Sequence, residues 1–133
     1  MKRRSFFIGI FMFFLIFPVF AWEPIGTYWD IPEPRLVSPV IDEINLKGKA
    51  SLEFKWMISY FNQVAYYEIR LYKGYNMLAS TLFFKQRIPY PTNSLDLETE
   101  LFENGQIYTW SLIQVASDGL KSARSFSSFK VIK

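Results

Sequence analysis

Alternation of apolar and polar residues is the feature of this chain that most limits its fold. It occurs in four stretches separated by turn-forming residues, at positions 52–56, 66–72, 102–110 and 125–131. A period of two places the apolar side chains on one face of a strand and the polar ones on the other. Several short strands at this spacing are typical of two antiparallel sheets packed face to face. The sequence therefore predicts an all-β sandwich.

Seven antiparallel strands are expected. They cover about residues 35–37, 51–58, 65–72, 77–84, 94–103, 106–115 and 125–132. The fifth stretch fits two interpretations, because Ser94 would also cap a short helix, whereas Leu95 and Leu97 fit an alternating strand. We favour a strand followed by a tight corner. The first stretch follows a proline-rich segment, so we expect it at a sheet edge.

The N-terminal segment has the layout of a secretory signal peptide. Three basic residues at positions 2–4 precede an apolar run over 6–17, and Val19 and Ala21 suit the positions that signal peptidase reads. The alternative is a retained membrane anchor. Spanning a bilayer takes about 20 apolar residues, and this run is shorter and is interrupted by Pro18. We expect cleavage after Ala21 and export to the periplasm or the extracellular space.

The expected domain organisation has three parts. Residues 1–21 are the signal peptide, residues 22–34 are a lead-in rich in proline and aromatic residues, and residues 35–133 are the sandwich domain. The three basic residues of the leader account for the whole excess of 15 Lys and Arg over 12 Asp and Glu. A nucleic-acid binder usually carries a concentrated basic footprint, and the sequence shows none. We therefore expect no nucleic-acid partner.

Residue types exclude most catalytic sites. The chain has no His and no Cys, so Ser-His, Cys-His and His-metal sites cannot form. An acidic cluster at Asp96, Glu98, Glu100 and Glu103 has the residue type of a glycosidase carboxylate pair or of calcium ligands. It lacks the spacing of a dedicated calcium loop, and we interpret it as solvated surface. We expect no catalytic residues, no metal site, no cofactor, and thus no enzyme.

Two groups of aromatic residues are candidates for binding. Trp22, Tyr28 and Trp29 lie in the lead-in, where they would stack on sugar rings, anchor in a protein groove, or cover an open sheet edge. We favour the covering role. Tyr66, Arg70 and Tyr72 are the second group, on the outward face of one strand together with Glu68. Tyr and Arg are enriched at interface hot spots, although cross-strand support is the ordinary role of such residues.

Residues 35–133 resemble a fibronectin type III domain, a member of the immunoglobulin-like superfamily. Trp56 matches the family's Trp on the second strand, and Tyr67 matches the Tyr near the start of the next strand. The family's corner has a Leu, then Pro-Gly, then a Tyr six residues after the Leu. Here Phe102 replaces the Leu and Asn104 replaces the Pro, while Tyr108 agrees.

The resemblance has further implications for these residues. The run Tyr-Thr-Trp-Ser-Leu from Tyr108 resembles the version common in bacterial exported members. Tyr108 would be a tyrosine-corner residue whose hydroxyl bonds backbone upstream. Trp56, Tyr67, Tyr108 and Trp110 are all expected in the core. The family's Arg-Gly-Asp tripeptide is absent, so integrin binding is not carried over.

The sequence predicts an exported, non-catalytic binding or scaffolding module that acts through protein–protein interaction. Its expected partner is another protein of the cell envelope or the extracellular space. One alternative is a carbohydrate-binding module that uses exposed aromatic residues on a glycan. Another is a membrane-tethered accessory subunit, if the leader is retained.

Overall fold

The computed structural model describes residues 31–60 and 63–133, and the compact unit runs from Ile31 to Lys133. The expected signal peptide lies outside the described residues, as do Trp22, Tyr28 and Trp29 of the lead-in. Two carbonyl groups of the described lead-in bind the sandwich: Gln114 Nε2 donates to the Pro32 oxygen and Ser125 Oγ donates to the Pro34 oxygen. The backbone just before the first strand is therefore part of the packed unit.

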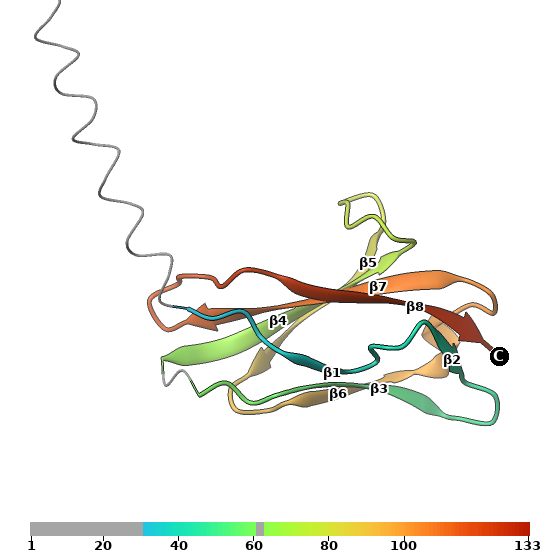
Figure 1. The fold of residues 1–133 in the computed structure, drawn as a ribbon, viewed down its shortest axis with the longest axis horizontal. Helices are drawn as coiled ribbons and strands as arrows, with labels where there is room; N and C mark the ends of the chain where they lie inside the picture. Colours follow the sequence, from blue (N-terminus) through green and yellow to red (C-terminus); the bar gives the residue numbers. More distant parts are fainter. Residues whose placement is uncertain (1–30, 61–62) are drawn as a thin grey trace, which may run out of the picture. The chain divides into compact units, whose positions relative to one another are not determined.

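Two sheets pack face to face (Figure 1). The smaller sheet has the order β1-β3-β6 and contains β1 (Leu36–Ser38), β3 (Ser51–Trp56) and β6 (Ser94–Glu98). The larger sheet has the order β2-β8-β7-β4-β5 and contains β2 (Glu43–Asn45), β8 (Ser125–Ile132), β7 (Ile107–Ala116), β4 (Val64–Lys73) and β5 (Leu82–Pro89). The predicted all-β sandwich is confirmed.

One short strand was not expected from the sequence. β2 pairs with β8 in parallel, whereas every other strand pair of the described residues is antiparallel. It has three residues, of which only Ile44 is buried. Three residues are too few to show a period of two, so the sequence predicts seven strands and the structure has this eighth one.

The core lies between the sheets and is rich in aromatic side chains. Phe54 of β3 meets Trp110 of β7 at 5.1 Å between ring centroids, with the planes at 72°. Trp56 of β3 meets Tyr67 of β4 edge to face at 5.5 Å. Edge-to-face contacts of this kind add to the stabilisation from burial alone. The predicted inward positions of Trp56, Tyr67, Tyr108 and Trp110 are confirmed, because all four have 0% exposure.

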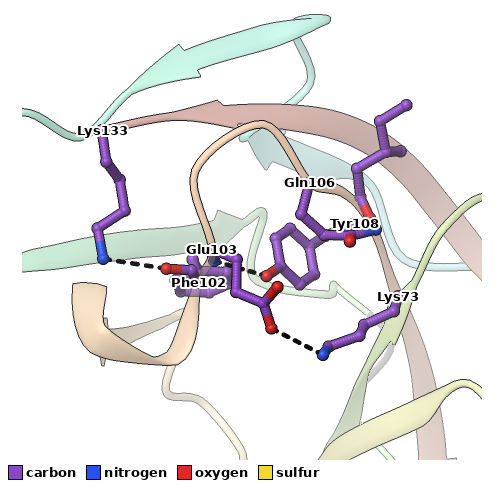
Figure 2. Close-up of polar contacts among 7 residues, drawn as sticks. Lys73, Phe102, Glu103, Gln106, Tyr108 and Lys133 are labelled. Carbon is purple, nitrogen blue, oxygen red and sulfur yellow. Dashed lines mark hydrogen bonds and ion pairs between the residues drawn. The ribbon is translucent and has the colours of Figure 1, made fainter.

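The chain turns between the sheets at a tyrosine corner (Figure 2). The Glu103 backbone N–H donates to the Tyr108 hydroxyl at 2.7 Å, which confirms the predicted bond to upstream backbone. Gly105 has φ of 82°, a value that residues with a side chain rarely adopt. Asn104, at the usual Pro position, accepts from the Lys133 backbone N–H through its side-chain oxygen. The two departures from the family pattern therefore leave the corner intact.

Two segments differ from the predicted bounds. The prediction of a strand over residues 77–84 is wrong at its start, because β5 begins at Leu82 and ends at Pro89. The Thr81 hydroxyl donates to the Asn76 and Leu78 carbonyl groups and holds the preceding residues in a turn. Residues 94–103 contain both predicted conformations: β6 forms the strand, and Thr99–Leu101 form one turn of 3₁₀ helix before the corner.

Within residues 31–60 and 63–133 we find no helix with the length and apolar character that crossing a membrane requires.

Burial also predicts how stability depends on alkaline pH. Desolvation raises the pKa of Tyr67 and of Tyr108 above the ordinary value near 10. A pKa that is higher in the folded state than in the unfolded state stabilises the fold below pH about 10, and this contribution is lost as the pH rises further. We expect the free energy of unfolding, measured by denaturant titration, to fall above pH about 10. Tyr67→Phe should make that fall shallower and Tyr75→Phe, at an exposed site, should not; equal slopes in all three proteins would contradict the prediction.

Candidate binding surface

The outer face of the larger sheet carries the predicted Tyr66, Arg70 and Tyr72. They alternate along β4 with the core residues Tyr67, Ile69 and Leu71, because successive side chains of a strand point to opposite faces. β5 and β7 pair with β4 on its two sides. Side chains from three strands therefore meet on this face.

Glu68 is the charged centre of this face. Its side chain is only 6% exposed, and its carboxylate lies 3.1 Å from Arg70 Nη2 and 3.7 Å from Lys85 Nζ. The strand register sets this arrangement, since Arg70 lies opposite Lys85 and Glu68 lies opposite Arg87. A carboxylate this deeply buried is accompanied by positive charge, as the cost of its desolvation requires.

The neighbours of Arg70 on β4 favour its charged form. A hydrogen bond with the Tyr72 side chain raises the pKa of Arg70, and the charge of Glu68 raises it further. Its side chain keeps 29% exposure, whereas Tyr72 is 2% exposed. Of these two predicted contact residues, Arg70 therefore reaches solvent and Tyr72 does not.

Tyr66 is half-buried, and the Arg87 guanidinium lies 4.7 Å from the centroid of its ring. This is the geometry of a cation–π contact. The three predicted residues of β4 are thus brought to one face, but each contacts a charged neighbour on that face. The other three predicted residues, Trp22, Tyr28 and Trp29, lie outside the described part of the chain.

A groove of about 260 Å³ opens beside Arg70. Its walls come from β4, from β7 and from the connection between β7 and β8, and its lining residues are Glu68, Arg70, Ser111, Ile113, Lys121, Ser122 and Arg124. The connection folds against β7 because Ser122 N–H donates to the Gln114 carbonyl group and Ser122 Oγ accepts from the Gln114 N–H. Lys121 and Arg124 are thereby held across the groove from Arg70.

Sequence reasoning missed Lys121 and Arg124. They belong to a short exposed connection, and nothing in their local sequence indicates the strand that they face. The signal available was the Ser117-Asp118-Gly119 turn, which predicts that the chain reverses direction. The fold also brings Arg70 of β4 to the same groove as Lys121 and Arg124 of the β7–β8 connection, which a search along the sequence does not detect.

The outer face of the smaller sheet has the opposite charge. Glu53 of β3 lies directly opposite Asp96 of β6, and Glu98 lies opposite Ser51. The described residues contain no group of three or more His, Cys, Asp or Glu side chains arranged to hold a metal ion. Like charges placed directly opposite each other on a sheet are mildly destabilising. These acidic residues therefore do not stabilise the smaller sheet, but they make the two outer faces of the sandwich opposite in charge.

No family model matches the chain, and no curated protein sequence matches it. Solved structures do resemble it, among them the following two. The crystal structure of chicken CNTN1 FN1-FN3 domains has a TM-score of 0.55 at 14% identity and matches 76% of this chain and 33% of that chain. The fn3 domain of the human collagen alpha-1(XX) chain, solved in solution, has a TM-score of 0.53 at 15% identity and matches 83% of this chain and 93% of that chain.

Both neighbours consist of fibronectin type III domains. At this identity the likeness concerns the fold alone, and this chain spans about one third of the CNTN1 fragment. The two-sheet order and the tyrosine corner agree with that likeness. The chain has the fibronectin type III fold, within the immunoglobulin-like class of sandwiches.

Proposed function

We propose that this protein is an exported, non-catalytic module that binds another protein through the outer face of its larger sheet. The observation that carries the proposal is the Glu68–Arg70 pair, in which the carboxylate is buried, beside a groove lined by two more cations. An apolar group in place of a buried ion pair is often neutral or stabilising, so stability alone does not account for these charges. Arg and Tyr are also the residue types enriched at interface hot spots.

Export and the class of partner rest on the sequence. The basic and apolar leader that ends at Ala21 supports secretion, and an exported module meets proteins of the envelope or the extracellular space. The absence of His and Cys from the whole sequence supports a non-catalytic role. Proteins with this type of fold serve many different functions, so the fold by itself does not identify a partner, and the residues of the site must do so.

Glycan binding is a second candidate, supported by Trp22, Tyr28 and Trp29 in the lead-in sequence. Aromatic rings of this kind stack on sugars, and loss of glycan binding in Trp22→Ala or Trp29→Ala would favour it. A membrane-tethered accessory subunit is the third, and it requires an intact leader. The mass of the protein purified from its host distinguishes cleavage after Ala21 from retention.

The proposal predicts where a partner crosslinks. A photo-crosslinking residue in place of Lys121, in the groove, is expected to capture one dominant protein in the native host. The same residue in place of Ser51, on the exposed outer face of the smaller sheet, is the matched control and should capture little. Mass spectrometry of the crosslinked products identifies the partner. Equal capture at both positions, or recovery of cell-wall glycan without a protein, would argue against the proposal.

A further inference from the structure

We infer that the groove beside Arg70 binds a carboxylate side chain from an acidic segment of the partner protein. This inference rests on the proposed function and names the chemistry of the partner. It assigns Arg70 as the anchor, with Lys121 and Arg124 on the opposite side of the groove. Glu68 acts as a positioning residue for Arg70.

The donor groups of the groove suit a carboxylate. A guanidinium carries five N–H donors in a planar fork, and Glu68 takes one Nη2 donor of Arg70 at 3.1 Å. The donors that remain can pair with a carboxylate through two parallel hydrogen bonds. In this geometry Arg binds a carboxylate better than Lys does. Since Glu68 already holds the guanidinium, less side-chain freedom is lost when an anion binds.

The charge balance of the groove also favours an anion. Its lining has three cations, Arg70, Lys121 and Arg124, against the single carboxylate of Glu68. Neither Lys121 nor Arg124 forms an ion pair with any residue in the described ranges 31–60 and 63–133. Within the same ranges Arg124 donates only to the Met77 sulfur, at 3.9 Å. Positive charge that is not neutralised within the protein attracts an acidic partner and raises the rate at which that partner associates.

Size and lining point to a side chain of a protein. A volume of about 260 Å³ is below the range of about 300–1,000 Å³ that small-molecule sites occupy. The groove has an apolar wall at Ile113 and hydroxyl groups at Ser111 and Ser122. Methylene groups of a Glu side chain pack on such a wall, whereas a sulfated or phosphorylated sugar offers mostly polar surface. A second copy of this chain also offers exposed carboxylates, at Glu53 and Asp96 of a strand pair and at Asp42 and Asp118 outside the strands, so self-association is tested below as a separate outcome.

The test uses an acetylated, fluorescently labelled hexaglutamate peptide and the chain as purified from expressing cells. Fluorescence anisotropy is expected to show binding that weakens as salt is added, since exposed charges are screened. Hexaglutamine, of equal length without charge, should not bind. Arg70→Lys, which keeps the charge but loses the planar fork, should weaken binding about tenfold. Lys121→Glu with Arg124→Glu should weaken it more.

Lys47→Glu is the matched control for charge. Lys47 is exposed in the turn after β2, away from the residues that line the groove, so binding should be unchanged. Circular dichroism and thermal unfolding check that each variant is folded. Hexaglutamate that does not bind, or that binds equally well to the Arg70→Lys protein, overturns the inference. Binding of heparin that depends on Arg70 without binding of hexaglutamate, or self-association that Arg70→Lys abolishes, overturns it as well.

The carboxylate-binding inference and the proposed function can fail independently of each other. A protein crosslinked at position 121 together with no hexaglutamate binding would leave the proposed function standing and remove this inference. Hexaglutamate binding in the absence of any crosslinked protein would remove the proposed function and restrict the groove to anion binding in solution.

Discussion

Replacing Trp56 by Ala is expected to lower the free energy of unfolding by about 3–5 kcal/mol. The side chain has 0% exposure and packs edge to face on Tyr67 with ring centroids 5.5 Å apart. Truncation removes a large apolar area from the core and leaves a cavity that rigid strands fill only in part. Since a domain of this size has a total stability of about 5–15 kcal/mol, the loss is a large part of the total, and the urea midpoint should fall markedly.

Urea denaturation followed by fluorescence or circular dichroism measures this loss. Tyr60→Ala is the matched control, because Tyr60 is 95% exposed and its truncation removes an aromatic ring without opening a cavity. A loss below about 1 kcal/mol in Trp56→Ala, or an equal loss in both variants, would contradict the core position of Trp56.

A comparison of two Trp→Phe variants refines the same prediction. The Trp110 indole N–H donates to the Pro39 carbonyl group at 2.9 Å, whereas the Trp56 indole N–H has no acceptor among the described residues. Trp110→Phe leaves a carbonyl group without its donor, while Trp56→Phe removes a buried donor that has no acceptor among residues 31–60 and 63–133. Trp110→Phe should therefore destabilise more than Trp56→Phe.

Replacing Tyr108 by Phe is expected to lower the free energy of unfolding by about 1–3 kcal/mol. The variant keeps the buried ring, which packs on Phe102 at 5.1 Å between centroids. It removes the hydroxyl that accepts from the Glu103 backbone N–H at 2.7 Å, and that donor is then left without a partner. The loss should be smaller than for Trp56→Ala because no large cavity forms.

Equilibrium denaturation of Tyr108→Phe, with Tyr75→Phe beside it, measures the effect of the hydroxyl. Tyr75 is 68% exposed, so loss of its hydroxyl should leave stability within the experimental error. Equal stability of wild type and Tyr108→Phe would show that the hydrogen bond at the corner adds nothing to the fold.

The strands of the core were predictable because their signal is local. Leu52, Phe54 and Trp56 alternate with charged residues, and the burial pattern of β3 follows that alternation at every position. The same holds for the corner, where Phe102, Gly105 and Tyr108 lie within seven consecutive residues. The start of β5 was not predictable, because Met77 and Leu78 are apolar but belong to a turn that the Thr81 hydroxyl holds.

The candidate surface was predictable only along one strand. Tyr66, Arg70 and Tyr72 share the outer face of β4 as the period of two requires. The sequence did not indicate that Tyr72, on that same outer face, is 2% exposed. It also did not show that Glu68 is buried between Arg70 and Lys85, since Lys85 is on a different strand.

The sequence by itself determined the fold class, the core aromatic residues and the tyrosine corner, because each depends on residues close together in the chain. Tertiary structure alone decided which charges meet. Arg70 reaches Lys121 and Arg124 across one groove only after β4 pairs with β7 and the next connection folds back. Strand pairing joins residues that are distant in sequence, and no local pattern specifies which of them become neighbours.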